Sequence, residues 1–342
     1  MRNSSGHLLR VWGLCSVLSA AAVARPPTQL RFEITPIRSL LEGGAFASPE
    51  AINNRGDVVG TSPSPSGAYR PFLYRNGTTT ELLIGDPGQS GYAVDINDSG
   101  DIVARAVVKG REHTFLIQRQ GIIDLHIQTG LEISPLNIND RGVIAANVWQ
   151  GTRNDAVTWS KGVVRYLESD STRGSDAGQI NNHGQVLASL YGAPFPSEPA
   201  GYYSALFSGR SILWLRFAAG LLNDRGHIAG QYYSTNELRA VLFRDGVWRD
   251  VGMLPGDVKI RPAAINNSDW IVGTSEGPGE VERAFLYADG QLHDLNDLIP
   301  PNSGWRLLHA TNLNDRGEIT AYGSNQGQES GLLLRPTKRG RK

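Results

Sequence analysis

Short apolar runs rich in Val, Ile, Leu and aromatic residues alternate along this chain with turns of Gly, Asn, Asp and Ser. Runs of this kind predict β-strands, and the turn residues predict tight reversals because Gly and Asn accept a backbone with positive φ. The run 92–96, for example, is followed by Asn97-Asp98-Ser99-Gly100 and then by a second run over 101–108. The pattern therefore predicts an all-β chain built from hairpins.

One turn recurs seven times: an apolar residue, an Asn, a second Asn or Asp and, usually, a Gly two residues later. The first Asn of the copies is Asn53, Asn97, Asn139, Asn181, Asn223, Asn266 and Asn314, so successive copies lie 42 to 48 residues apart. A fixed period in this range is typical of propellers, solenoids and arrays. The sixth copy has Asp269 in place of the Gly, which predicts a different turn geometry there.

Each repeat contains a second hairpin after the Asn turn. In the second copy the run 114–117 turns at Arg119-Gln120-Gly121 and returns along 122–125. Four short strands that run up and down make one blade of a β-propeller. The seventh repeat lacks its fourth strand, whereas the run 30–40 near the N-terminus has no partner of its own. We therefore expect a seven-bladed β-propeller of four-stranded antiparallel blades, which spans residues 25–336 and is closed by the N-terminal strand.

The N-terminal segment 1–24 differs from the repeats. Arg2 and Arg10 precede or border an apolar run over 11–23, and a small-residue pattern, Ala22-Val23-Ala24, ends it. This predicts a secretory signal peptide and a mature chain that is periplasmic or extracellular. The alternative is an amphipathic helix or membrane anchor, but the run is short for a bilayer span, so we expect no membrane insertion after cleavage. The single cysteine, Cys15, would leave with this segment.

Composition narrows the function classes. The chain has 33 basic and 33 acidic residues, so no net charge favours binding to nucleic acid. Separately, we expect the protein to be a monomer. The abundance of Gly, at 40 residues, suits many tight turns. The basic segment 337–342 is expected to be a disordered tail.

The repeats resemble the HAF repeat of bacterial extracellular proteins, named for a His-Ala-Phe tripeptide at the start of the third strand. The tripeptides here are His113-Thr114-Phe115, Arg70-Pro71-Phe72, Arg239-Ala240-Val241 and Arg283-Ala284-Phe285. The other shared features are the Ile-Asn-Asp turn itself and a Leu-Gly-x-Leu-x-Gly exit, matched by Val251-Gly252-Met253-Leu254-Pro255-Gly256. No copy spells the tripeptide in full. The resemblance implies an exported, repeat-built protein and no particular reaction.

The Asn and Asp residues of the turns raise the question of calcium. A calcium loop needs six to eight convergent oxygens, and each turn offers one or two, so we assign turn geometry, no metal and no cofactor. Before the apolar residue of each turn stand Ala51, Asp95, Asn137, Gln179, Leu221, Ala264 and Asn312. This set, expected near the propeller axis, has one carboxylate, so no glycosidase-like pair is evident, and we name no catalytic residue. Asp95 is expected to be a hydrogen-bonded structural acid.

The long links of the repeats, from second to third strand and from blade to blade, are expected on one face. They carry the candidate ligand-binding residues Tyr69, Trp149, Tyr202, Tyr203, Tyr232, Tyr233 and Trp305. Aromatic rings among Ser, Gly and Asn suit recognition of a glycan, a peptide or a protein. The alternative is that the rings pack against the blade ends. The leading hypothesis is thus a binding or scaffold module, the second is a carbohydrate-active hydrolase or lyase at the channel mouth, and the third is a structural part of the cell envelope.

Overall fold

The computed structural model describes residues 30–42, 47–167, 174–192, 195, 197, 199–235 and 237–337. The chain divides into two units, Met1–Leu30 and Arg31–Lys342. The predicted signal peptide and residues 338–342 of the predicted tail lie outside the described residues. None of the helices in the described part of the chain is long and apolar enough to cross a membrane.

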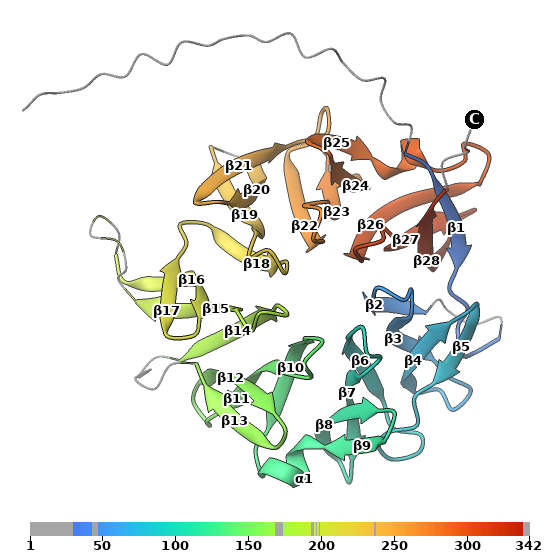
Figure 1. Ribbon diagram of the computed structural model, residues 1–342. Coiled ribbons are helices and arrows are strands. Elements are labelled where there is room, and N and C mark those ends of the chain that lie inside the picture. Colours follow the sequence, from blue (N-terminus) through green and yellow to red (C-terminus); the bar gives the residue numbers. More distant parts are fainter. Residues whose placement is uncertain are drawn as a thin grey trace, which may run out of the picture. The chain divides into compact units, whose positions relative to one another are not determined.

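The second unit is a ring of seven four-stranded antiparallel blades, as the repeat pattern predicted (Figure 1). Blades one to three consist of β2 (Ser48–Ile52), β3 (Val58–Pro63), β4 (Tyr69–Arg75) and β5 (Thr78–Glu81); β6 (Gly91–Ile96), β7 (Ile102–Val108), β8 (Arg111–Gln118) and β9 (Gly121–Asp124); and β10 (Ile133–Ile138), β11 (Ile144–Trp149), β12 (Asn154–Ser160) and β13 (Val163–Tyr166). Two single-turn helices lie in links between blades, α1 (Leu125–Thr129) and the 3-10 helix η1 (Leu295–Leu298).

The next three blades have the same plan. They consist of β14 (Ser175–Ile180), β15 (Val186–Gly192), β16 (Gly201–Ser208) and β17 (Ser211–Trp214); β18 (Ala218–Leu222), β19 (Ile228–Ser234), β20 (Glu237–Arg244) and β21 (Val247–Gly252); and β22 (Lys259–Ile265), β23 (Ile271–Glu276), β24 (Glu282–Ala288) and β25 (Gln291–Asp294). A single parallel pair, Leu238 with Lys259, joins blades five and six into one larger sheet.

The seventh blade confirms the predicted closure. It contains β26 (Trp305–Leu313), β27 (Ile319–Asn325) and β28 (Gln328–Pro336), and its outer strand is β1 (Phe32–Pro36). β1 pairs antiparallel with β28 from Phe32 opposite Pro336 to Pro36 opposite Leu332. The first strand of the ring thus completes the last blade, and no long sheet edge is left open between them.

The hydrophobic core lies between neighbouring blades. One cluster combines Val103 and Leu116 of blade two with Ile138 and Trp159 of blade three. Near the axis the blades converge, and each second strand has a small residue at the same place in the repeat. These residues are Gly60, Ala104, Ala146, Ala188, Gly230, Gly273 and Ala321. At Gly273 a Cβ atom would lie 2.0 Å from the Arg261 carbonyl oxygen, so that site requires Gly.

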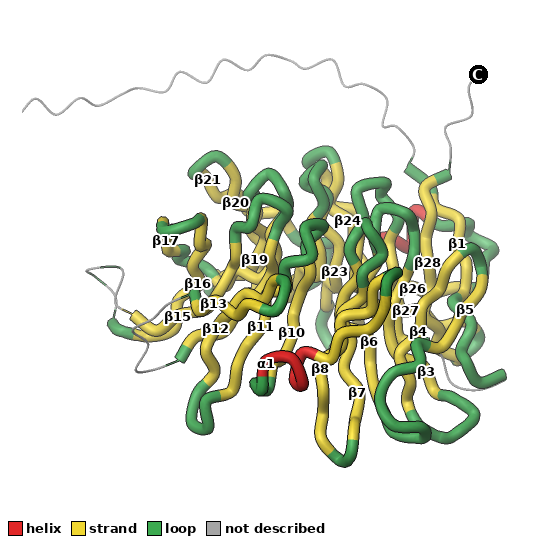
Figure 2. Tube along the Cα trace, turned by 60° about the horizontal axis from the view of Figure 1, so that its bottom comes forward, coloured by secondary structure: helices red, strands yellow, loops and turns green. Residues whose placement is uncertain are grey.

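The strand directions sort the loops onto two faces. First and third strands run toward the Asn turns, so the Asn turns and the turns between third and fourth strands share one end of the ring, which we call the Asn-turn face. The links from second to third strands and from blade to blade share the other end, the long-loop face. Figure 2 shows the strands running between these two sets of loops.

Candidate functional site

Each Asn turn is closed locally by its first Asn. In the third blade the Oδ1 atom of Asn139 accepts the backbone N–H groups of Arg141 at 3.1 Å and Val143 at 3.0 Å. The Asn139 side chain is buried. This is the side-chain-to-backbone bonding expected of Asn in turns, and it places the Nδ2 group toward the neighbouring blade.

The Nδ2 groups of these residues connect the blades in a closed ring. Each Nδ2 donates to the backbone carbonyl of the equivalent Asn in the next blade at 2.9 to 3.1 Å, and Asn314 donates to Asn53. One side chain must therefore accept through Oδ1 and donate through Nδ2. An amide can do both, whereas a carboxylate can only accept. This explains why the position is Asn in all seven copies.

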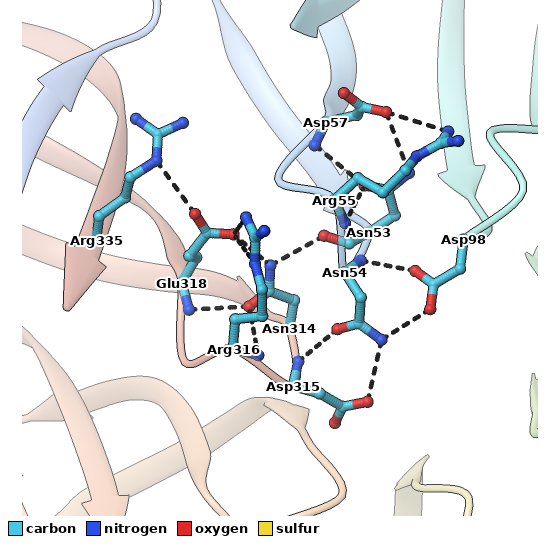
Figure 3. Close-up of polar contacts among 10 residues, drawn as sticks. All are labelled: Asn53, Asn54, Arg55, Asp57, Asp98, Asn314, Asp315, Arg316, Glu318 and Arg335. Atoms are coloured by element: carbon cyan, nitrogen blue, oxygen red, sulfur yellow. Dashed lines mark hydrogen bonds and ion pairs between the residues drawn. The ribbon is translucent and has the colours of Figure 1, made fainter. Parts of the chain in front are cut away.

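The second residue of each turn forms another closed ring. Its backbone N–H donates to Oδ1 of the equivalent residue in the next blade, at 2.6 to 2.8 Å. Here the side chain needs only to accept, so Asn and Asp both serve. Figure 3 shows Asn54, whose Nδ2 bridges the carboxylates of Asp98 at 2.8 Å and Asp315 at 3.1 Å.

Charged pairs surround the rings. Asp57 accepts two hydrogen bonds from Arg75, both at 2.8 Å. Arg55 lies 3.2 Å from Asp57, and Glu318 pairs with Arg316 and Arg335 (Figure 3). Burial alone would raise the pKa of the Asp57 carboxyl, but Arg75, Asn53 and Arg55 together outweigh burial and hold that pKa below its ordinary value. The pKa of Glu318 is lowered in the same way against burial, mainly by Arg316.

The sixth turn corrects the sequence expectation. Asp269 takes the left-handed conformation with φ of 61°, and its N–H bonds to the Asn266 carbonyl at 3.0 Å, as Gly does in the other turns. The geometry is therefore the same. The carboxylate receives hydrogen bonds from Asn223, His227 and Arg244 of blade five, and these contacts offset the strain of a left-handed non-Gly residue.

The two rings line a channel cavity of about 190 Å³, smaller than ordinary ligand pockets of roughly 300–1,000 Å³. Asp95 lies on its wall and accepts hydrogen bonds from the N–H groups of Ile96 and Ile138, both at 2.8 Å, and from Asn137. The contacts agree with a structural acid that joins blades two and three. Burial raises the pKa of Asp95 to about 7, although its three donors act in the opposite direction.

A β-bulge places Asp95 and its equivalents on the wall. The register between first and second strands shifts by one residue in every blade near this point, as between Ala93 and Asp95. A bulge leaves a residue unpaired and turns the next side chain.

Among the described residues, no cluster of three His, Cys, Asp or Glu side chains could hold a metal ion.

The long-loop face has larger cavities. One, of about 440 Å³, lies between blades two and three and is lined by Arg105, Arg111, Glu112, His126, Glu132, Ile133, Ser134, Trp149 and Asn154. Trp149 is 51% exposed. Arg105 donates to the hydroxyls of Tyr92 and Ser134 and pairs with Glu112.

A second cavity, of about 520 Å³, lies at the long-loop end of blade seven. It is lined by Pro36, Ile37, Arg38, Ser39, Trp305, Asn325, Gln326, Gln328, Glu329 and Ser330. Two of the seven predicted residues, Trp149 and Trp305, thus each line a cavity with amide, hydroxyl and charged groups around the ring. We call these the Trp149 cavity and the Trp305 cavity.

The structure does not bring the predicted tyrosines together with these cavities. Tyr69 and Tyr233 are exposed on blades one and five. Tyr202 packs edge-on against Tyr191, and Tyr203 donates to the Pro199 carbonyl at 2.7 Å. Tyr232 packs against Trp248 and donates to Asp250 at 2.9 Å.

Sequence reasoning missed the partners of the two tryptophans. Arg105, Glu112 and His126 come from three elements of blade two and its following helix, and Arg38 comes from the opposite end of the chain to Trp305. No spacing in the sequence relates these residues. Only the repeat period could have indicated which residues surround the tryptophans, because it places the end of one blade beside the start of the next.

The chain matches no known protein-family model and no curated protein. Among solved structures it is similar to the β-propeller domain of the Trilobed protease from Pyrococcus furiosus, described as having an open velcro topology, with a TM-score of 0.53 and 12% identity over 73% of this chain and 81% of that one. It is also similar to YCF48 bound to D1 peptide, with a TM-score of 0.55 and 10% identity over 91% and 97% of the two chains.

A puromycin hydrolase is a third similar structure, with a TM-score of 0.56 and 15% identity over 87% of this chain and 54% of that one. At such low identity these likenesses show the fold alone. The β-propeller fold is shared by binding scaffolds and by enzymes, so the fold does not decide the function.

Proposed function

We propose that this protein is an exported, monomeric binding module of the HAF-repeat type, and that it takes a glycan, a peptide or an envelope protein on its long-loop face. The proposal combines the signal-peptide pattern of residues 1–24 with the chemistry of that face. Export and ligand binding are separate claims and have separate tests.

One observation carries the binding claim: Trp149 and Trp305 each line a cavity of ligand size on the same face, about 440 and 520 Å³. An indole ring offers a flat apolar surface, and the surrounding amide, hydroxyl and charged groups offer directed hydrogen bonds. This combination suits ligands rich in hydroxyl or amide groups.

The Asn-turn face is less suited to a ligand than the long-loop face. Its polar groups bond to one another in two closed rings, and each carboxylate oxygen of Asp98 and Asp140 accepts a hydrogen bond within those rings. A general acid and base need room for substrate between them, and the channel cavity is about 190 Å³. This weighs against the hydrolase or lyase hypothesis at this mouth of the channel.

The binding test uses glycan and peptide arrays with the chain from residue 25 onward. We expect binding that is lost at least tenfold in Trp149→Ala or Trp305→Ala. Trp248→Ala is the matched control, because Trp248 is 56% exposed and lies on the outer strand β21, away from both cavities. Binding that survives both cavity substitutions, or the absence of any array ligand, contradicts the proposal.

Export is tested by expressing the full chain and sequencing the N-terminus of the mature protein. Cleavage after Ala24 would give a chain beginning at Arg25 in the periplasm or medium. Retention of the intact N-terminus in the cytoplasm contradicts this part.

A further inference from the structure

The Trp305 cavity lies where the two ends of the propeller meet. Pro36, Ile37, Arg38 and Ser39 leave the closing strand β1, whereas the other lining residues belong to β26 and to the β27–β28 hairpin. Residues almost 300 positions apart in the chain therefore share this cavity. Within a blade, the described strands pair across the two ends of the chain only here, where β1 pairs with β28.

The cavity contains uncommitted hydrogen-bonding groups. Within the described residues, the side chains of Arg38, Gln326, Gln328 and Glu329 make no hydrogen bond or ion pair, and neither does the indole N–H of Trp305. Arg261 of blade six, by comparison, is paired with Glu276 at 2.6 Å and with Glu282 at 3.2 Å. The free groups comprise both donors and acceptors, which is what a ligand rich in hydroxyl groups requires.

The charge of the cavity narrows the ligand class. Its lining has one guanidinium, Arg38, and one carboxylate, Glu329, with amides and hydroxyls between them. These charges balance, so the cavity has no net field that would select an anion or a cation. A peptide that binds as an added strand needs a long free strand edge. β28 is paired with β1 from Leu332 to Pro336 and with β27 from Gln328 to Leu334, so only the short stretch from Gln328 to Ser330, paired with β27 alone, is open beside the cavity.

We propose that the Trp305 cavity binds a neutral oligosaccharide, which stacks a sugar face on Trp305 and bonds its hydroxyls to Gln326, Gln328 and Arg38. This inference rests on the proposed binding function and specifies one site and one ligand class for it. Amide side chains donate and accept at once, and this matches sugar hydroxyls, which do the same.

Because the Trp305 cavity is lined from both ends of the chain, a bound ligand should also hold β1 in place. β1 is held by its pairing with β28, by the Ile37 N–H on the Gly331 carbonyl at 2.8 Å and by the Thr337 N–H on the Arg31 carbonyl at 2.9 Å. A ligand that contacts Arg38 on one side and Gln328 on the other binds completely only when β1 is docked. Ligand binding therefore stabilises the closed ring by mass action.

The experiment titrates the chain from residue 25 onward with uncharged hexasaccharides of β-glucan, mannan and xylan, and with a charged oligogalacturonate, by calorimetry. We expect one neutral hexasaccharide to bind, with the affinity reduced at least tenfold in Trp305→Ala and Gln328→Ala and unchanged in the control Trp248→Ala, which lies away from the cavity. Trp149→Ala is titrated beside them. Melting curves of the free variants check that they fold. Hydrogen exchange then follows the β1 amides, whose protection should rise about 100-fold when ligand is present at 100 times its Kd.

The possible results distinguish failure of this site, of its ligand class or of its link to ring closure from failure of the proposed binding function. Binding that is lost in Trp149→Ala but kept in Trp305→Ala supports the binding function and overturns this site. Trp305-dependent binding of peptides or of the charged sugar, with no neutral sugar bound, overturns the ligand class. Trp305-dependent binding of a neutral sugar without added protection of β1 overturns the link to ring closure. Failure of every glycan and peptide overturns the proposed function itself.

Discussion

The ring of Asn side chains makes a sharp prediction for Asn139→Ala. The substitution removes three hydrogen bonds: the Nδ2 bond to the Asn181 carbonyl at 3.0 Å and the two bonds that Oδ1 accepts from Arg141 and Val143. The Asn181 carbonyl also accepts the Gly184 N–H at 3.0 Å, so it keeps one partner. Asn139 suits the test because its Nδ2 has no second partner in its own turn, unlike that of Asn181, which also bonds Gln185.

The expected loss of stability follows from the burial of each group. The buried inter-blade bond contributes about 1 kcal/mol net, and the half-buried Val143 N–H, left without an acceptor, costs about 1–2 kcal/mol. The N–H of the exposed Arg141 can turn to water at a cost of about 0.5 kcal/mol. We therefore expect a loss of about 3 kcal/mol in the free energy of unfolding.

Guanidinium denaturation measures this loss as a lower midpoint with an unchanged m-value. The matched control is Asn302→Ala, since Asn302 is exposed in a loop on the long-loop face, and its effect should stay within about 0.5 kcal/mol. Asn139→Asp separates the two roles, because a carboxylate still accepts but cannot donate to the Asn181 carbonyl. Its burial beside that carbonyl raises its folded pKa, so part of the lost stability should return as pH falls toward 4. A loss below about 1 kcal/mol in Asn139→Ala, or one equal to the control, would refute the ring as a stabilising device.

Three further substitutions test other parts of the ring. The pKa of Asp95 is about 7 in the folded protein and lies above its unfolded value, so the wild type loses stability as pH rises from about 4 through 7. Asp95→Asn has no carboxyl to ionise, so its stability relative to the wild type should rise over this window by at most about 4 kcal/mol, and by less if channel water solvates the carboxylate. Denaturation at pH 4 and pH 8 measures the difference. Equal pH dependence of both proteins contradicts this. Gly273→Ala should cost about 3 kcal/mol, because its Cβ would meet the Arg261 carbonyl oxygen at 2.0 Å; an unchanged melting temperature contradicts this. Ile37→Ala should cost about 2–5 kcal/mol and speed hydrogen exchange in β1, because Ile37 packs with Leu333 and the core of blade one; unchanged exchange in β1 contradicts this.

Much of the fold follows from the sequence, because its evidence is local and repeated. The seven Asn turns count the blades, and the missing fourth strand of the last repeat predicts that β1 pairs with β28. The turn at Asp269 was predicted wrongly. The loss of Gly there is local information, whereas the contacts with His227 and Arg244 that compensate for it come from another blade.

The candidate site was predicted less completely. Placing Trp149 and Trp305 on the long-loop face needs only the direction of each strand, which the repeat supplies. The cavities around them depend on which residues two blades or two chain ends bring to the same place. Arg38 and Gln328 meet only after the ring has closed. The predicted tyrosines line neither cavity, because the position of a ring in a long loop does not determine which blade ends surround it.

The same distinction separates the two positions of each Asn turn. From the sequence alone the pair is a tight turn, and this is correct because Oδ1 satisfies two N–H groups of its own turn. The seven-fold repetition, the strand order and the closing strand are likewise determined by sequence, through local propensity and period. Tertiary structure decides why the first position is always Asn and the second is Asn or Asp. In the closed ring the first side chain must donate to the next blade and the second needs only to accept, and these directions exist only once seven blades stand side by side.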